Sequence, residues 1–286
     1  MRRADGQTGG WAACLLCLLV APAGLSAQAD CFPSQDSNEA KTFAIFSVPL
    51  AYSPLAAPDP APRKWRLGLE VSSLPNVDDE TATPTECRPG KGPENTDLLP
   101  ALFRPRVAVL LGGGVLIDAS WIPPVRINGV KSNLFGLALG WSGAIGGNFT
   151  LGARAHGTFG EVNAPITCSE DALQDPTSEC FEGTVSDDSY KPNIFGADVR
   201  LGLGKAESKV HPYAGLGYNR LQPRFQVNFT NSAGELDDRK VTVDMNRLAV
   251  FGGLSWKLGQ SLGLAGEVYS TPSDAVTVRI AFGGSF

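Results

Sequence analysis

The sequence predicts an all-β protein, a closed antiparallel transmembrane β-barrel of about ten strands with an N-terminal arm or plug. Three features of the 286-residue chain favour this fold. The chain begins like a secreted protein, most of it alternates apolar and polar residues, and its connections alternate between short and long. It has no later segment apolar enough for a transmembrane helix, and a closed barrel is the other structure that satisfies every backbone polar group in lipid.

The N-terminus has the charge and apolar order of a secretory signal. Arg2 and Arg3 precede a short apolar run over residues 11–20, and small residues follow up to Ala29. The run is too short to span a bilayer, so we expect residues 1–29 to be a signal peptide, with a retained anchor as the alternative. The full chain has 24 basic and 29 acidic residues, and the signal holds two of the basic and one of the acidic residues. The remaining chain has 22 basic and 28 acidic residues, a net charge of −6.

Alternation with a period of two defines the barrel over residues 64–286. Residues 149–160 show it most clearly, because one face is apolar and the opposite face carries Arg154 and His156. Apolar residues that face lipid and polar residues that face a lumen are typical of membrane barrels. Nine further segments follow the same pattern, which gives ten strands.

The connections also predict a barrel with two different rims. Short links at residues 112–114, 146–148, 205–209 and 259–261, all but the third containing glycine, suit tight hairpins, and longer polar links alternate with them. The parity slips within residues 211–230 and 240–256. These slips suggest either β-bulges in a hairpin that continues above the bilayer or two extra short strands, which would make twelve.

Residues 30–63 do not follow the barrel pattern. Their final part, residues 54–63, is rich in proline and alanine and should be extended. Residues 39–50 are apolar enough for a short helix or a strand, and periodicity does not decide between the two. We therefore expect residues 30–63 to form either a periplasmic arm or a plug inside the lumen.

The C-terminal residues 275–286, AVTVRIAFGGSF, resemble the closing strand of bacterial outer-membrane β-barrel proteins. The resemblance to this superfamily covers about residues 64–286 and names no single family. It implies a bacterial outer-membrane location, contact with outer-membrane lipid, and recognition by the barrel-assembly machinery through Phe282 and Phe286. A plug would be similar to that of the fatty-acid transporters of this superfamily, whose chains are far longer.

Charged and polar residues gather on the inward parity of the expected strands. They could line a polar channel, or they could pair with one another and fill a narrow barrel. The expected lumen-lining residues are Arg66, Glu70, Asp118, Arg154, His156, Asp198, Arg200, Glu267 and Arg279.

Four cysteines remain after the signal, an even number that suits an oxidising compartment. Cys168 and Cys180 lie in one expected loop, so we predict a disulfide between them. Cys31 and Cys87 are left over. If they pair, the N-terminal arm must pass through the barrel and would be a plug.

The sequence gives no reason to expect an enzyme. An outer-membrane hydrolase would need a histidine beside a carboxylate or serine at the long-loop rim. The strand assignment instead places His156 in mid-strand and His211, the other histidine, near a short turn. We expect no catalytic residues, no metal, no cofactor and no nucleic-acid partner, because metal-ligand spacing and a nucleotide fingerprint are missing.

Aromatic residues near expected strand ends favour a membrane barrel over a soluble one, since tryptophan and tyrosine form girdles at lipid–water boundaries. The expected function is a narrow channel or transporter for small polar solutes or ions. The alternative is a non-conducting structural or surface-binding barrel with acidic loops, and the oligomeric state stays open. The expected girdle comprises Trp65, Trp121, Trp141, Tyr218, Trp256, Tyr269 and Phe286.

Overall fold

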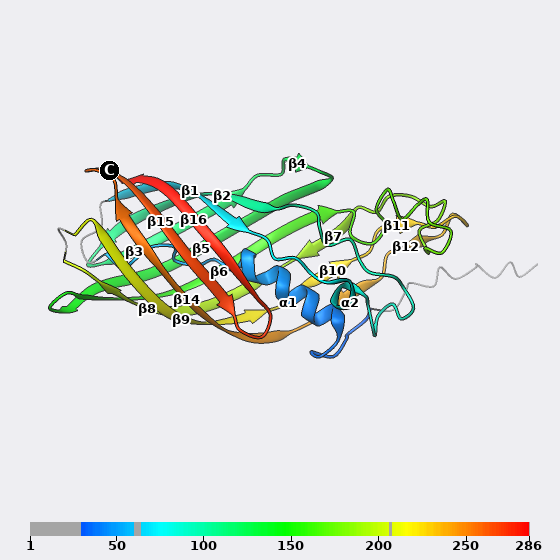
Figure 1. The fold of residues 1–286 in the computed structure, drawn as a ribbon, viewed down its shortest axis with the longest axis horizontal. Coiled ribbons are helices and arrows are strands. Elements are labelled where there is room, and N and C mark those ends of the chain that lie inside the picture. Colours follow the sequence, from blue (N-terminus) through cyan, green and yellow to red (C-terminus); the bar gives the residue numbers. More distant parts are fainter. Residues whose placement is uncertain (1–29, 60–63, 206–207, 286) are drawn as a thin grey trace, which may run out of the picture.

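Ten strands form one closed antiparallel barrel in the computed structural model, which describes residues 30–59, 64–205 and 208–285 (Figure 1). The expected signal peptide and Phe286 lie outside the described residues. The barrel strands are β1 (Trp65–Ser73), β2 (Ala101–Gly112), β3 (Val115–Ile122), β5 (Val130–Gly146), β6 (Phe149–Ala164), β8 (Ile194–Leu203), β9 (Val210–Leu221), β14 (Met245–Lys257), β15 (Leu262–Thr271) and β16 (Ala275–Ser285).

The barrel closes where its first strand meets its last. β1 pairs with β16 from Arg66 opposite Ser285 to Ser72 opposite Arg279. Every other neighbouring pair is antiparallel, and the long β5–β6 hairpin joins the two halves of the sheet. Closure leaves no barrel strand with a free edge, which is the condition for placing a sheet in lipid.

The prediction of ten strands is confirmed, and the count of twelve is wrong. The polypeptide of β9 and β14 does continue beyond the barrel, as the short strands β10 (Arg224–Gln226) and β13 (Lys240–Thr242). Outside the barrel, β10 pairs with β13 on one side and with β7 (Asp188–Lys191) on the other. The parity slips therefore mark breaks beside Pro223 and Asp244, where the chain leaves the barrel ladder, rather than bulges within it.

The two rims differ as the connection lengths predict. Four short turns join strands at the end of the barrel that holds the C-terminus, and the long connections lie at the opposite end (Figure 1). The long connections carry β7, β10, β13 and the short elements α2 (Asp79–Ala82), β4 (Arg126–Ile127), β11 (Phe229–Thr230) and β12 (Leu236–Asp237). We call the assembly of these connections the cap.

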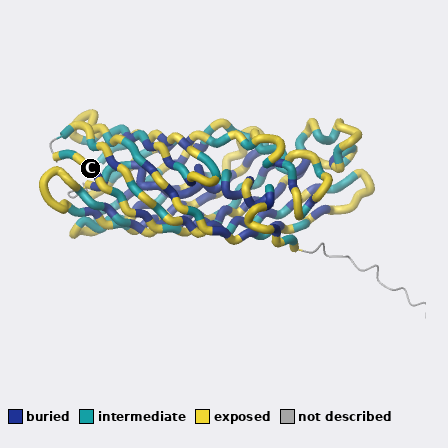
Figure 2. Tube along the Cα trace, turned by 60° about the horizontal axis from the view of Figure 1, so that its bottom comes forward, coloured by how far each residue is buried: buried dark blue, intermediate teal, exposed yellow. Residues whose placement is uncertain are grey.

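The outer surface of the barrel is apolar. Exposed residues alternate with buried or half-buried ones along the strands (Figure 2), and many of the exposed residues are leucine, valine, isoleucine or aromatic. Leu137 and Leu201, for example, are 49% and 42% exposed. An apolar exterior of this extent suits contact with lipid tails.

Five members of the expected aromatic girdle are exposed on this surface, namely Trp65, Trp121, Trp141, Tyr218 and Trp256. Tyr269 is a correction, because it is 3% exposed and faces the lumen. It shares the parity of Glu267 on β15, so its position near a strand end was a weaker guide than its side of the strand.

Helix α1 (Asn38–Leu50) fills the long-loop half of the lumen. Ser37 caps its N-terminus by accepting a hydrogen bond from the Ala40 amide, and Pro49 lies in its last turn. Its apolar face packs on Phe225, Tyr190 and Val241 of the cap strands, which forms the hydrophobic core of the molecule. Beyond the helix, residues 51–59 run through the other half of the lumen, where they meet polar residues of the wall.

No helix among the described residues has the length and the apolar character needed to cross a membrane.

Candidate functional site in the barrel lumen

All nine residues expected to line the lumen face inward. Seven of them are at most 8% exposed, and Arg66 and Arg200 border a cavity inside the barrel. They lie on β1, β3, β6, β8, β15 and β16, so the site draws on the whole circumference. The segment that we call the plug, residues 38–59, lies among them, and its backbone hydrogen-bonds to three of them, Arg154, Glu267 and Arg279.

Barrel arginines bind the C-terminal end of α1. The last carbonyls of a helix lack partners within it, and this end carries partial negative charge. Arg279 donates to the carbonyls of Ala51 and Val48 at 2.8 and 2.6 Å, and Arg104 donates to that of Leu50 at 3.1 Å. Two wall strands thus satisfy the carbonyls of the helix and fix its depth in the barrel.

Two buried carboxylates balance these arginines. Glu70, which is fully buried on β1, lies 3.5 Å from Arg104, 3.0 Å from Arg106 and 3.9 Å from Arg279. Asp118 on β3 lies 2.6 Å from Arg106. A buried charge is tolerated when it is paired and hydrogen-bonded, and this cluster meets both conditions.

Tyr52 joins the plug to the centre of the cluster. Its hydroxyl donates to Asp118, and its carbonyl accepts from Arg154. The Arg106 guanidinium lies 4.4 Å from the centre of its ring, a cation–π contact. The wall makes room for this ring at Gly136, where an added Cβ would lie 3.1 Å from it.

The rest of the plug is bound through its backbone. The Leu55 amide donates to Glu267 at 3.2 Å, and the Ala57 amide donates to Ser255 at 2.8 Å. The carbonyls of Pro58 and Asp59 accept from Thr150 and Ser142, at 3.1 and 2.6 Å. A polar wall therefore replaces the water that would otherwise hydrate this extended segment.

The two histidines lie apart. His156 Nε2 is 3.5 Å from Asp198, deep in the lumen, and Arg154 also binds Asp198, at 2.7 Å. His211 lies beside the carbonyl of Ser208 at a short turn. Neither histidine is at the long-loop rim. Among the residues described, no three His, Cys, Asp or Glu side chains gather in a way that could hold a metal ion.

Several residues of the site are not among the nine lumen-lining residues expected from the sequence. Arg104 and Arg106 lie on the inward parity of β2, but Pro105 between them interrupts the apolar pattern and hides it. Tyr213 and Tyr269 bind Glu267 and Asn219 in the lumen. Parity alone could have found these four residues. Tyr52 could not be found in this way, since the plug has no strand period.

Comparisons with known proteins show likeness only at the level of fold. No family model matches the sequence, and no curated protein matches it. Ail, the attachment invasion locus protein of Yersinia pestis, is 10% identical with a TM-score of 0.31, and the match covers 78% of this chain and 98% of Ail. The toluene transporter TodX of Pseudomonas putida is 13% identical with a TM-score of 0.30, covering 85% of this chain and 72% of TodX.

A FadL homologue of Pseudomonas aeruginosa is 14% identical with a TM-score of 0.32, covering 79% of this chain and 63% of that protein. TM-scores of this size support no inference about what this chain does. What decides the assignment is the closed ten-strand ladder, its apolar exterior and its short-turn and long-loop rims. The chain has the fold of a bacterial outer-membrane β-barrel. In such barrels the long loops are extracellular and the short turns are periplasmic, and we name the two ends accordingly.

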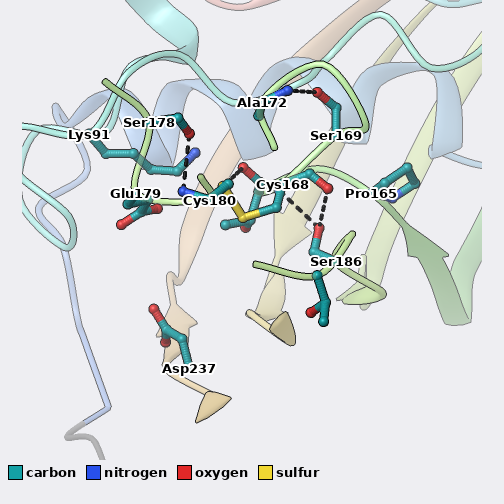
Figure 3. The surroundings of a disulfide bond; sticks show 12 residues. Lys91, Pro165, Cys168, Ser169, Ala172, Ser178, Glu179, Cys180, Ser186 and Asp237 are labelled. Carbon is teal, nitrogen blue, oxygen red and sulfur yellow. Dashed lines mark hydrogen bonds between the residues drawn. A yellow bond between two sulfur atoms is a disulfide. The ribbon is translucent and has the colours of Figure 1, made fainter. Parts of the chain in front are cut away.

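Two disulfides brace the extracellular cap. The predicted Cys168–Cys180 bond is confirmed, and it closes a loop in which Ser186 and Ser178 hold the backbone of the two cysteines (Figure 3). Cys31 and Cys87 also form a disulfide. This second bond ties the chain just before α1 to the connection between β1 and β2.

Arg88 links three connections of the cap. It forms ion pairs with Glu94 and Glu179 and lies 3.7 Å from Asp237, while its own side chain is 3% exposed. Burial in this cluster raises the pKa of Glu94, although Lys91 and Arg88 act in the opposite direction. The carboxylates converge on one buried guanidinium, so the cap should move as a single unit.

Glu39 anchors the extracellular end of the plug. Burial tends to raise its pKa, but hydrogen bonds from the amides of Cys87, Glu86 and Thr85 outweigh this and lower it. The three amides lie 2.8, 2.9 and 3.0 Å from one carboxylate oxygen. The helix is therefore tied to the same segment by a disulfide and by a charged hydrogen-bond cluster.

Proposed function

We propose that this protein is a barrel that is closed at rest, and that it works through its acidic extracellular cap. One observation carries the proposal. The plug is hydrogen-bonded to the wall along its length and is attached covalently on both sides, by the Cys31–Cys87 disulfide and by the chain that leads into β1. A segment held in this way fills the lumen that a diffusing solute would need.

The charge of the cap supports a binding role. The connections that form the cap, residues 74–100, 123–129, 165–193, 222–244 and 272–274, contain 18 acidic and 7 basic residues. Two disulfides and the buried Arg88 hold this surface in shape, which reduces the ordering cost of binding. Charge complementarity favours a basic partner, such as a cationic peptide or protein surface. The proposal includes no catalytic step.

Recordings in planar bilayers test the closed state. We expect wild-type protein to insert without opening a conductance. A variant with a Gly/Ser linker in place of residues 38–58 should conduct, because the lumen then holds only wall side chains. Spontaneous, repeated opening of the wild type would overturn the closed-barrel proposal.

Binding of polylysine to the protein in nanodiscs tests the cap. We expect binding that weakens as salt rises, and further weakening in the triple variant Asp171→Asn, Asp175→Asn, Glu182→Gln. The matched control, Lys205→Gln and Lys209→Gln at the periplasmic turn, should bind like wild type. Equal binding by the acidic variant and the wild type would remove the cap from the proposal.

A gated narrow channel is the second candidate function. The observation in its favour is the polar wall around the plug, since most of the plug contacts are single hydrogen bonds to its backbone. The variant pair Cys31→Ser and Cys87→Ser separates the two functions. Gating predicts that loss of this disulfide produces intermittent conductance, and a permanently closed barrel predicts silence. The Cys168→Ser and Cys180→Ser pair is the control, because that bond does not hold the plug.

A further inference from the structure

A small cavity lies in the periplasmic half of the lumen, beside the extended part of the plug. Its volume is about 20 Å³, which is room for a group the size of one or two water molecules. Arg66 of β1, Arg154 of β6 and Arg200 of β8 border it, together with Ser142 and Asp118. Three arginines from three strands thus surround one small space.

Two donors of arginines that border this cavity have no acceptor among the described residues. Arg200 Nε and one terminal nitrogen of Arg154 are buried without a hydrogen-bond partner. Over the parts of the chain that the structure describes, neither Arg66 nor Arg200 has a carboxylate within 4.0 Å. Arg154 itself is only 8% exposed. Buried polar groups in native proteins nearly always have partners, so a small acceptor in this cavity would satisfy these donors.

The acids of the lumen are already used elsewhere. Asp118, the one carboxylate that borders the cavity, is bound by Arg106 and Tyr52, and Glu70 serves the arginines at the end of α1. Asp198 and Glu267 each keep one buried oxygen without a partner, but neither of them borders the cavity. Within the described chain, Arg66 and Arg200 therefore have no carboxylate in direct contact, although Asp118 and Asp198 act on them over a longer distance.

The charge count agrees with this pairing. On the wall strands that the structure describes, six arginines and four carboxylates face the lumen, a formal excess of two positive charges, and Asp59 of the plug adds one negative charge. Water could satisfy unpaired N–H groups, but it could not offset this charge. The inward charged residues are Arg66, Arg104, Arg106, Arg154, Arg200 and Arg279 with Glu70, Asp118, Asp198 and Glu267.

We propose that this cavity binds one small inorganic anion, of the size of a halide, between Arg66, Arg154 and Arg200. The anion accepts hydrogen bonds from the unpaired guanidinium nitrogens and offsets charge that no described carboxylate contacts directly. Because the cavity also borders Pro54 of the plug, a bound anion stabilises the contact between the wall and the plug. The site does not depend on whether the barrel conducts or on what the cap binds.

Thermal unfolding in matched salts tests this site. Detergent-solubilised protein is heated in sodium chloride or sodium gluconate at equal ionic strength, and the loss of the compact electrophoretic form is followed. Gluconate is too large for the cavity. A ligand that binds only the folded state raises the Tm in a saturable way, so we expect a higher Tm in chloride than in gluconate.

Arginine variants test whether the anion binds in this cavity. Arg200→Gln should abolish the difference between chloride and gluconate, and Arg66→Gln should reduce it. Arg220→Gln is the matched control, since Arg220 is exposed at the extracellular end of β9 and should keep the full difference. The readout is a difference between two salts, so a general loss of stability in a variant does not obscure it.

Two results would overturn the proposal. One is a wild-type Tm that is the same in the two salts, and the other is an undiminished difference in Arg200→Gln. If Arg200→Gln does not fold, crystals of the wild type in sodium bromide decide the question. An anomalous peak between Arg66 and Arg200 supports the site, and bromide found only at the surface refutes it. Conductance recordings are independent of these measurements, so failure here leaves the closed-barrel proposal standing.

Discussion

At the scale of single residues, the plug depends on a few side chains that each make several contacts. Tyr52 combines a charged hydrogen bond, a backbone hydrogen bond and a ring contact within one fully buried residue. Arg279 binds two helix carbonyls and also lies 4.4 Å from the centre of the Tyr269 ring. Changes at such residues should disturb the plug more than changes at residues with one partner.

Tyr52→Phe should destabilise the protein by about 1–3 kcal/mol. The variant keeps the ring but leaves the buried Asp118 without one of its donors, and loss of a hydrogen bond to a charged group costs this much. Urea unfolding in detergent measures the effect. Tyr218→Phe is the control, because that tyrosine is exposed to lipid and should tolerate the change. Equal stability of the two variants would mean that the Tyr52 hydroxyl does not hold the plug.

Leu137→Arg and Leu201→Arg should each destabilise the barrel in lipid by about 2–4 kcal/mol, because a charge on the lipid-facing surface is costly near the middle of the bilayer. Leu236→Arg is the matched control, since Leu236 is 56% exposed in the cap and remains in water. Unfolding in liposomes measures all three variants. If Leu236→Arg costs as much as the other two, the outer surface does not face lipid.

At the scale of elements, the strand period made most of the barrel predictable. Side chains alternate strictly between lipid and lumen, so the sequence alone predicts which side of the barrel Leu137 and Arg279 face. The rule failed where other forces act. Pro105 obscured β2, and Tyr269 was assigned by its distance from a strand end. At Pro223 a short strand that pairs in the cap looked like an irregular part of the barrel.

Helix α1 was not predictable in the same way. Its sequence suits a strand as well as a helix, and its place is set by partners that are distant in sequence. Arg279 and Arg104 receive its carbonyls, and Glu39 receives amides of residues 85–87. Ser37 was the local signal for the start of the helix, as a residue that caps an N-terminus. Nothing within the segment reveals that a barrel surrounds it.

The anchoring of α1 should depend on pH. The folded state lowers the pKa of Glu39 below its ordinary value of 4.5, so the ionised carboxylate stabilises the fold at neutral pH. This contribution is complete above the ordinary pKa and is lost as pH falls through the lower, folded pKa. Wild type should therefore exceed Glu39→Gln in stability at pH 7, and the gap should close in acid.

Thermal unfolding from pH 7 into the acid range measures this gap. Glu80→Gln in α2 is the control, since that carboxylate is exposed and its loss should change stability little at any pH. A gap for Glu39→Gln that stays constant through the acid range would show that the charge of Glu39 does not contribute.

At the scale of the whole molecule, a polar interior and an apolar exterior are divided by a single layer of backbone. The chain turns the usual arrangement of a water-soluble protein inside out, except in the cap, where α1 and the outer strands form an ordinary apolar core. The cap can thus fold by burial of apolar surface, while the barrel depends on backbone pairing and on lipid.

Electrophoresis with and without boiling checks the closed barrel. Membrane-extracted protein should run as a compact form when unheated and shift after boiling, because a closed ladder resists detergent until heat opens it. A second pair of lanes with reductant should show whether the disulfides affect the unfolded form. Identical migration of the heated and unheated samples would contradict a closed barrel.

The Cys31–Cys87 bond has a consequence for how the protein is made. It joins two positions 56 residues apart, and the intervening stretch contains both the plug and the first wall strand. Once Cys31 and Cys87 are oxidised, these two parts lie in one covalent ring, and this disulfide can form before membrane insertion. We expect the seam between β1 and β16 to close sideways around a plug that is already in place, so that no free end has to be threaded through the barrel.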